Sequence, residues 1–492
     1  KKDEVADAQG CIQVYITTYV KLPSEGRTEY YVKTTSTGKG DGSSWDNAMS
    51  NEAFQLTLRY MEGQKTYHIA SGNYEPIYDA LGQKPLDGKD RTFYTGHAVT
   101  IIGGYPENAA EGDASDPKAN NTTFTSGKGE QSALNLFTAM LSDKGSVRIS
   151  GVAFSGRKDG EAVSVAGLVP GVSLSMQQCK VENFKTGVKL DSVSATISEC
   201  SFKDSVGILT TGLHADSLSI ESSTFTQGGQ GVVCTNPTSK LIFKNSTFVG
   251  LDKSAIDYSA CTSASCELVN NTILDNVYTA SATNDKWTGN IIGGKIIRKG
   301  TGGEKVASSY NLYLNEEEGV NKKAMETNSS AGTDIWTNVL CEEVLACDGG
   351  SYQLSNNKGF TETVALTTDM IEQADSTVSL RFPKVLDKDQ RGVSRMAKSC
   401  MGAYELKERD PMDLDIPTAF TPYTEDKKND IFMKGYEVYI YNRYGMLICH
   451  STDGWDGKYN DKTATPGVYA YVLIIPENGE QIKGTIEILK AK

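Results

Sequence analysis

The stretch Ile197-Ser-Glu-Cys-Ser-Phe202 is repeated, with substitutions, through the middle of the chain. Each copy has two apolar residues five positions apart, and the last residues of successive copies are 19 to 27 positions apart. The copies are Ile149–Phe154, Met176–Val181, Ile197–Phe202, Ile220–Phe225, Phe243–Phe248, Leu268–Ile273 and Trp287–Ile292. A repeat of roughly 20–29 residues indicates a solenoid, whose units bury their apolar faces only by stacking on one another.

The segments between the copies indicate which kind of solenoid this is. They contain short β-type runs bounded by the turn residues Gly, Ser, Asn and Asp, such as Thr186–Leu190, Val206–Thr210 and Gly231–Thr235. Neither a leucine ladder nor a ten-residue amphipathic run lies between the copies, which excludes leucine-rich and helical repeats. Short strands without a crossover helix predict a parallel β-helix, in which each coil lies about 4.8 Å above the last.

Stacking in register places equivalent residues in columns. One inward column is expected from Val181, Phe202, Phe225, Phe248, Ile273 and Ile292. A second is expected from Met176, Ile197, Ile220, Phe243, Leu268 and Trp287. An outward or turn position is shared by the hydroxyls of Ser201, Thr224, Thr247 and Thr272. Cys179 and Cys200 are also equivalent, and we favour small residues in an inward slot there over a disulfide or a metal site.

The composition limits the classes of function. The chain has 492 residues and a formal net charge of −13, which argues against nucleic-acid binding because such proteins need basic stripes. No run of 18 apolar residues is present, so no membrane span is expected. The opening Lys1-Lys-Asp-Glu4 lacks an apolar signal core and suits a mature exported protein, or the segment after a lipidated cysteine. Ten cysteines permit disulfides, for example Cys261/Cys266 or Cys341/Cys347.

The residues before the repeats predict a cap. Residues 1–29 contain one β-like run, Cys11–Val20, which we interpret as a strand or capping ribbon. Asp46 is a suitable N-cap for a helix that extends to about Met61 and carries Phe54 and Leu58 on one face. A single amphipathic helix ahead of a β-solenoid is expected to cover its open end, where unpaired strands would otherwise invite aggregation.

Several motifs resemble a known group of proteins. Tyr31-Val32, Gly38–Trp45, His68–Tyr74 and Ile101–Tyr105 look like the opening of right-handed parallel β-helix, pectate-lyase-like surface proteins of Bacteroidetes. The usual close of these proteins resembles Asp389-Gln-Arg-Gly392 followed by Met401-Gly-Ala-Tyr-Glu405. The resemblance implies a right-handed solenoid exported to the cell surface. It implies no particular chemistry, because this fold carries lyases, hydrolases and non-catalytic adhesins alike.

The end of the chain has a signature of its own. Five ordered motifs resemble the gliding-motility-associated C-terminal domain, the type B sorting module of type IX secretion: Pro417–Pro422, Asn429–Phe432, Ile440–Gly445, Gly454–Gly457 and Pro466–Tyr469. This resemblance implies an immunoglobulin-like β-sandwich with Trp455 in its core. The predicted organisation is therefore a capping segment (1–29), a β-helix (30–407), a linker (408–416) and a C-terminal β-sandwich (417–492).

Residues for catalysis are sought on the outward columns. Glu199, Glu221 and Lys244 stand on neighbouring rungs, and we interpret Glu221 and Lys244 as a surface ion pair. His214 with Asp216 is a possible base with its orienting group, although a solvated turn is the favoured interpretation. Asp257 is the one carboxylate in its outward column on the third strands, where it follows Lys189, Leu209 and Val233. Arg157-Lys-Asp-Gly160 is interpreted as a polar loop in preference to a substrate-gripping one.

These candidates do not form a catalytic set. A pectate-lyase mechanism needs clustered acidic calcium ligands and a nearby basic residue, and pectin-type hydrolysis needs paired carboxylates. Neither is visible, so we predict no catalytic residues, no metal site and no cofactor; calcium is an open possibility that no residue pattern supports. The leading hypothesis is a non-catalytic adhesin or glycan-binding protein on the outer surface of a Gram-negative bacterium, with a glycan or host-surface ligand as partner. The alternative is a polysaccharide lyase or glycoside hydrolase acting on acidic glycans. The oligomeric state is not readable from the sequence.

Overall fold

The structure is a computed structural model in which the chain separates into two compact units, Lys1–Leu406 and Lys407–Lys492. It describes residues 26–129, 132–212, 217–235, 240–261, 265–280, 284–299, 306–314, 321–322, 333–373, 376–406, 416–422, 430–460, 462–474 and 481–489. Within residues 1–25 it describes the backbone of two strands, β1 (Val5–Ala6) and β2 (Ile12–Gln13), which pair antiparallel. The rest of the predicted ribbon Cys11–Val20 lies outside the described residues.

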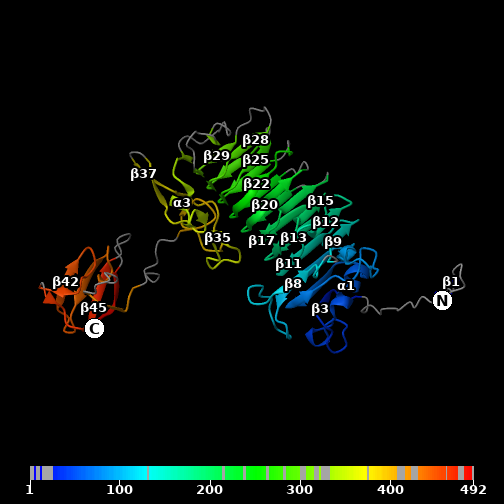
Figure 1. Ribbon diagram of the computed structural model, residues 1–492, viewed down its shortest axis with the longest axis horizontal. Helices are drawn as coiled ribbons and strands as arrows, with labels where there is room; N and C mark the ends of the chain where they lie inside the picture. Colours follow the sequence, from blue (N-terminus) through cyan, green and yellow to red (C-terminus); the bar gives the residue numbers. More distant parts are fainter. Residues whose placement is uncertain are drawn as a thin grey trace. The chain divides into compact units, whose positions relative to one another are not determined.

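The first unit is built from coils that stack along one axis (Figure 1). The first strand of each coil belongs to an 11-stranded parallel sheet. Its strands are β3 (Glu29–Val32), β4 (Lys65–Ala70), β7 (Val99–Tyr105), β10 (Ser146–Ser150), β13 (Ser173–Gln177), β16 (Ser194–Ser198), β19 (Ser217–Glu221), β21 (Lys240–Lys244), β23 (Ser265–Val269), β26 (Lys286–Thr288) and β29 (Ala307–Ser309).

The second and third strands of each coil share an 18-stranded sheet. Second strands are β5 (Gly72–Tyr74), β8 (Thr122–Thr125), β11 (Val152–Ser155), β14 (Lys180–Glu182), β17 (Ser201–Lys203), β24 (Thr272–Ile273), β27 (Ile291–Ile292), β30 (Leu312–Tyr313) and β31 (Ile335–Trp336). Third strands are β6 (Phe93–Thr95), β9 (Asn135–Leu141), β12 (Glu161–Gly167), β15 (Thr186–Asp191), β18 (Val206–Thr211), β25 (Val277–Ala280) and β28 (Ile296–Lys299). In two coils both strands are continuous, as β20 (Thr224–Cys234) and β22 (Thr247–Asp257).

The register between coils confirms the predicted columns. Phe202, Phe225 and Phe248 are direct partners on successive strands, and their rings stack at centroid distances of 4.7 and 4.8 Å. Ile197, Ile220 and Phe243 are partners in the same way on the other sheet. All these side chains are buried. These columns confirm the predicted parallel β-helix in an all-β chain.

The column of small residues is also as expected. Cys179 and Cys200 are buried in the core between the two sheets. The nine cysteines in the part of the chain that the structure describes are thiols and form no disulfide, including the pairs suggested by sequence spacing. Further along this column the side chains become asparagines. Asn271 Nδ2 donates to Asn290 Oδ1 at 3.0 Å and Asn290 Nδ2 donates to Asn311 Oδ1 at 2.8 Å, so neighbouring coils are joined inside the core.

The cap helix is present, but its predicted start is wrong. Asp46 lies in a short 3-10 turn (Trp45–Asn47), and helix α1 (Asn51–Tyr60) begins after Ser50, whose side chain accepts a hydrogen bond from the Ala53 N–H. Ser50 caps the helix in place of Asp46, because its hydroxyl accepts a hydrogen bond from a backbone N–H of the first turn. Phe54 is buried against Phe93 and Phe124, with ring centroids 6.0 and 6.1 Å away, so α1 covers the core at the first coils as predicted. A second 3-10 turn, Gly88–Asp90, precedes β6.

The motifs of the opening resemblance meet in one aromatic cluster outside the first sheet. His68 stacks on Tyr31 at 5.1 Å, and its Nδ1 lies 2.8 Å from the Tyr105 hydroxyl. Trp45 packs against Tyr31 and Tyr105 at 4.9 and 5.1 Å. Burial lowers the pKa of His68, which favours the neutral ring. These residues therefore attach the Gly38–Trp45 loop to the first coils.

The last coil strand ends at Trp336, well before residue 407, where we expected the β-helix to end. Helix α3 (Cys341–Val344) and four antiparallel hairpins follow. The hairpin strands are β32 (Cys347–Asp348), β33 (Ser351–Tyr352), β34 (Leu354–Ser355), β35 (Thr363–Val364), β36 (Met370–Gln373), β37 (Ser376–Ser379), β38 (Arg381–Pro383) and β39 (Lys398–Cys400). Ser351–Leu354 does not add a coil, because these residues pair antiparallel with local neighbours. Tyr310–Tyr313 does belong to the coils, through β30.

Residues 356–373 and 376–406, here called the strap, fold back along the outside of the β-helix. Gln390 inserts between coils: its Nε2 donates to Thr224 Oγ1 at 2.8 Å, and its Oε1 accepts from Thr247 Oγ1 at 2.6 Å. Asn270 Nδ2 donates to the Cys400 carbonyl at 3.1 Å. Apolar strap residues, including Phe382 and Met401, form a second core with outward residues of the last coils. The strap is thus packed against the β-helix through these buried residues.

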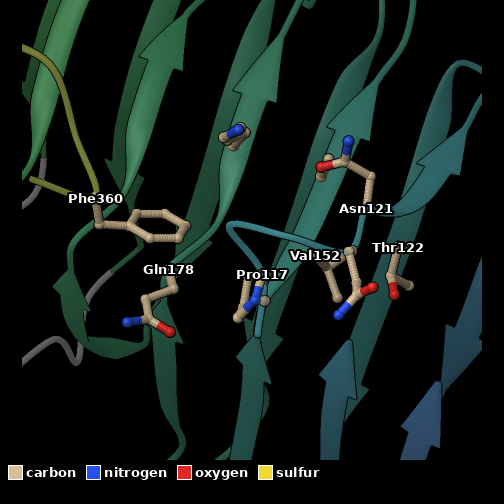
Figure 2. Close-up of a pocket in the computed structure, with 10 residues that line it drawn as sticks. Pro117, Asn121, Thr122, Val152, Gln178 and Phe360 are labelled. Atoms are coloured by element: carbon tan, nitrogen blue, oxygen red, sulfur yellow. The ribbon is translucent and has the colours of Figure 1, made fainter. Parts of the chain in front are cut away.

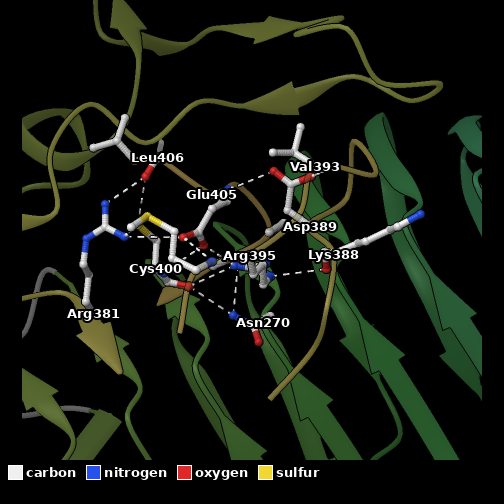
Figure 3. A network of polar contacts seen from close by, with 12 residues as sticks. Asn270, Arg381, Lys388, Asp389, Val393, Arg395, Cys400, Glu405 and Leu406 are labelled. Carbon is white, nitrogen blue, oxygen red and sulfur yellow. Dashed lines mark hydrogen bonds and ion pairs between the residues drawn. The ribbon is translucent and has the colours of Figure 1, made fainter. Parts of the chain in front are cut away.

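The closing motifs form the polar centre of the strap (Figure 3). Arg395 and Glu405 are fully buried and 3.0 Å apart, and Arg395 Nη2 also donates to Asn245 Oδ1 at 2.8 Å. Asp389 Oδ1 accepts the N–H groups of Arg391 and Val393, each at 2.9 Å. Asp389 therefore caps the turn formed by this motif. The Arg391 guanidinium lies 3.5 Å from the Tyr404 ring centroid.

The second unit is a small β domain. One sheet has the order β40-β46-β45-β41-β42. These strands are β40 (Ala419–Phe420), β41 (Glu437–Tyr441), β42 (Leu447–Ser451), β45 (Gly467–Ile474) and β46 (Gln481–Ile488). A hairpin of β43 (Lys458–Tyr459) and β44 (Lys462–Thr463) completes it. Trp455 is fully buried among Phe420, Phe432 and Tyr469, as expected from the resemblance.

We predict that Phe225→Ala destabilises the β-helix by about 3–5 kcal/mol, because it opens a cavity in the middle of the ring stack. Urea unfolding followed by far-UV circular dichroism measures the change. Val233→Ala is the control, since Val233 lies on the same strand but faces outward and half exposed; its cost should stay near or below about 1 kcal/mol. Equal costs for the two variants would contradict the inward column.

We further predict that Arg395→Ala costs about 3–5 kcal/mol, because it leaves the buried Glu405 carboxylate without its closest cation. Hydrogen exchange of the Gly402 and Ala403 amides, which bond to the β-helix, should speed up. Lys384→Ala, which removes an exposed ion pair with Asp387, should leave both stability and exchange unchanged. Slow exchange in the Arg395 variant would show that the strap does not depend on this network.

Candidate functional site

The predicted site residues Glu199, Glu221 and Lys244 lie at the carboxyl ends of three neighbouring strands of the first sheet. Glu199 adopts a left-handed turn with φ of 51°, and its Oε2 accepts hydrogen bonds from Gln178 at 3.0 Å and Gln177 at 3.4 Å. Glu221 and Lys244 are register partners on β19 and β21. The ion pairs within 4.0 Å in the described part of the chain do not include this pair, so our expectation of an ion pair there is wrong.

The other predicted residues are not brought to these strand ends. Asp257 lies on β22 in the opposite sheet, where its Oδ1 accepts hydrogen bonds from the backbone and hydroxyl of Ser259 at 3.1 and 2.6 Å. That geometry is a local turn. His214 and Asp216 lie outside the described residues. The role of any of the six residues in ligand binding stays a prediction.

The outward hydroxyl ladder is unavailable to ligands. Thr224, Thr247 and Thr272 are register partners as expected, but the strap covers them and all three are buried. Before the strap, the same wall carries a shallow notch (Figure 2) between Pro117 of a surface loop and Phe360 of the strap. Its volume is about 10 Å³, which is room for roughly one water molecule. This notch is therefore too small to hold a sugar residue.

A larger cleft lies at the corner where second strands turn into third strands. This corner cleft has a volume of about 410 Å³, within the usual range for ligand sites. Five successive coils contribute to it, through Lys158, residues 182–184, 203–205 and 227–229, and Asp252. Asn183 and Gln227 have positive φ values of 67° and 54° at these turns. Tight turns thus bring polar side chains of several coils to one trough.

The corner cleft carries both signs of charge on exposed or half-exposed side chains. Lys158, Glu182 and Asp252 are exposed, and Lys203 is half-buried. Lys203 Nζ lies 3.4 Å from the strap carboxylate Glu362, which places the edge of the strap beside the cleft. The cleft therefore offers ammonium groups, carboxylates and amides to one ligand, which suits a molecule with many hydroxyl groups and some charges.

Among the carboxyl groups that line the corner cleft, only that of Asp204 is buried. Its Oδ1 accepts the Phe184 N–H at 2.8 Å, and its Oδ2 is buried without a hydrogen-bond partner among the described residues. Burial raises the pKa of Asp204 to about 7; the Phe184 N–H opposes this and the Glu182 carboxylate adds to it. A raised pKa suits a general acid, but both oxygens face protein instead of the cleft, so proton transfer to a ligand there is not supported.

The sequence columns missed this cleft for a physical reason. Glu182 and Lys203 directly follow the inward residues Val181 and Phe202, and Asp204 comes one residue later. These cleft residues are therefore next to a column that the sequence predicts correctly. Beyond that point the turns differ in length, and the register shifts between Gly228 and Gln230. Hydrophobic periodicity fixes inward positions and leaves such turns undetermined.

Other kinds of site are not found among the described residues. No group of three or more His, Cys, Asp or Glu side chains there is placed to hold a metal ion. None of the helices in that part of the chain has the length and hydropathy needed to cross a membrane.

Two protein families match the chain. Residues 138–316 match the family described as right handed beta helix region, and residues 414–488 match the CHU_C type IX secretion signal domain. The chain is a β-helix protein with a C-terminal secretion signal domain. No curated protein and no solved structure matches it. The signal domain implies export to the cell surface or the extracellular space, in agreement with the localisation expected from the sequence.

The raised pKa of Asp204 predicts how the stability of the exported protein varies with pH. An unfolded Asp titrates near 3.9, so between about pH 4 and 7 the folded state holds one proton more than the unfolded state. The free energy of unfolding must then fall as pH rises through this window, by up to about 1.4 kcal/mol per pH unit. Asp204→Asn should remove this part of the slope and raise stability at pH 8, because an amide also accepts the Phe184 N–H.

Urea unfolding at half-unit steps from pH 4 to 8 measures the effect. Asp252→Asn is the matched control, since Asp252 is exposed in the same cleft and should leave the slope unchanged. Burial also raises the pKa of Asp275, to about 6, so the comparison is with the wild-type slope and not with zero. Identical profiles for wild type and Asp204→Asn would contradict the buried acid.

Proposed function

We propose that the β-helix unit binds a glycan at the corner cleft, as a non-catalytic, adhesin-like surface protein. The supporting observation is the cleft itself: polar and charged side chains from five successive coils line one trough, while its single buried carboxyl faces protein. A polysaccharide repeats its hydroxyl groups along its length, as the coils repeat their side chains about every 4.8 Å. The ammonium groups of Lys158 and Lys203 favour a glycan that carries carboxylates.

The alternative, a polysaccharide lyase or glycoside hydrolase, needs an acid and a base that both reach the bound sugar. Glu182 and Asp252 are exposed in the cleft, but Asp204 has the raised pKa and is turned away. The carboxyl with the raised pKa is thus separate from the exposed ones, which favours glycan binding over glycan cleavage. Attachment to the outer membrane through a lipid stays a prediction from the opening residues.

The test is binding of the purified chain to a panel of neutral and uronate-containing oligosaccharides. We expect Lys158→Ala/Lys203→Ala to weaken uronate binding about tenfold or more, because each charge-assisted hydrogen bond contributes about 1.5–3 kcal/mol. Lys118→Ala/Lys240→Ala is the control, since both lysines are exposed and lie outside the cleft.

Three outcomes would count against the proposal. Failure to bind any glycan, or equal affinities for the cleft and control variants, would remove the corner cleft as the site. Release of reducing ends or of unsaturated products, with or without calcium, would instead support the lyase or hydrolase.

A further inference from the structure

The C-terminal unit carries a groove that glycan binding by the β-helix does not explain. It lies between the turn after β41, the β43–β44 hairpin and the start of β45, and has a volume of about 560 Å³. We call it the hairpin groove. Arg443, Tyr444, Ile448, Tyr459, Lys462 and Val468 are among its lining residues. The groove belongs wholly to the secretion signal domain.

Apolar side chains are unusually exposed around this groove. Tyr444 is 78% exposed and Val468 is 57% exposed, and both line it. Met446 and Leu447, which follow Tyr444 in sequence, are 49% and 46% exposed. A single exposed apolar residue needs no explanation, but several around one groove of a small domain mark a contact surface. Tyr and Arg are also the side chains that most often carry the energy of protein interfaces.

The charge of the groove is one-sided in the described residues. Arg443 and Lys462 both line it, and neither forms an ion pair within 4.0 Å there. Elsewhere in the domain Lys458 pairs with Asp456 at 3.2 Å, and His450 lies 2.7 Å from Glu437. The guanidinium of Arg443 lies 4.9 Å from the Tyr444 ring centroid, so cation and aromatic face are presented together. Two unpaired cations beside apolar side chains fit a partner that is acidic and apolar.

The backbone beside the groove is also open. β42 is the last strand in the order of its sheet, so one of its edges has no strand partner among the described residues. Ile448 of β42 lines the groove. An extended peptide can add to such an edge through main-chain hydrogen bonds, with side-chain pockets giving specificity. Because side chains alternate along a strand, an added strand can direct acidic residues one way and apolar residues the other.

We propose that the hairpin groove is the surface through which the export machinery recognises this secretion signal, by docking an extended acidic segment of one of its proteins along β42. Carboxylates of that segment pair with Arg443 and Lys462, and its apolar side chains pack on Tyr444 and Val468. This recognition takes place on the C-terminal unit and does not depend on the glycan proposal for the β-helix.

Direct binding tests the chemistry of the groove. The probes are a labelled twelve-residue peptide of alternating glutamate and leucine and its glutamine–leucine counterpart, titrated against the full chain by fluorescence anisotropy. We expect at least tenfold tighter binding of the glutamate peptide, and loss of that preference in Arg443→Ser/Lys462→Ser. Tyr444→Ser/Val468→Ser should weaken both peptides. Lys434→Ser/Lys483→Ser, which removes two exposed lysines outside the groove, should change neither.

Export tests the biological role. In a bacterium with a type IX system, we expect at least fivefold less full-length protein at the surface for Arg443→Ser/Lys462→Ser, with normal export of the Lys434→Ser/Lys483→Ser control. Arg443→Lys/Lys462→Arg, which keeps both charges, should export normally and exclude misfolding as the cause. Equal affinity for the two peptides, or normal export of the serine variant, would each overturn the proposal. None of these results bears on binding at the corner cleft.

Discussion

Hydrogen bonding between successive coils is the constraint on which the β-helix depends. Parallel strands in register place each residue over its equivalent one coil away, so an apolar residue at one inward position requires an apolar residue at the same position in the neighbours. The stacked rings of Phe202, Phe225 and Phe248 follow from this. So do the hydrogen bonds that link the side-chain amides of Asn271, Asn290 and Asn311. Each of these side chains packs on or bonds to its own counterpart, which helps to keep coils of 19 to 27 residues in one register.

An array of this kind exposes polar backbone at its ends and apolar surface wherever an outward position is apolar. Helix α1 buries the first coils, and the strap covers Thr224, Thr247 and Thr272 together with apolar residues of the last coils. The strap stays in place through groups that are costly to bury alone, above all Arg395 and Glu405. Breaking such a pair is far more costly than forming it is favourable. The network therefore fixes where the strap lies more than it adds net stability.

The sequence predicts the parts of this molecule that repeat. The columns through Phe225 and Ile220, the buried Cys179 and Cys200, and the cap helix were all predictable from periodicity and apolar spacing. The closing and opening motifs were recognisable, although only coordinates show that Glu405 meets Arg395 and that His68 meets Tyr105. The start of α1 was missed because Ser50 competes with Asp46 over four residues. The strap over the hydroxyl ladder and the corner cleft depend on long-range folding and on turn lengths, which periodicity does not encode.

A hydrogen bond that recurs between coils favours binding, the function that we propose, over catalysis. Asp204 accepts the Phe184 N–H of the preceding coil, and Asp275 Oδ2 accepts the Leu251 N–H of its preceding coil at 3.1 Å. Asn321 accepts the Ile296 N–H in the same manner at 2.8 Å with a neutral side chain. Neither Asp275 nor Asn321 lines the corner cleft. A carboxyl that makes the bond used at other corners belongs to the architecture, and its high pKa follows from burial. On our proposal, the solvent-facing lysines, carboxylates and amides of the cleft hold the glycan.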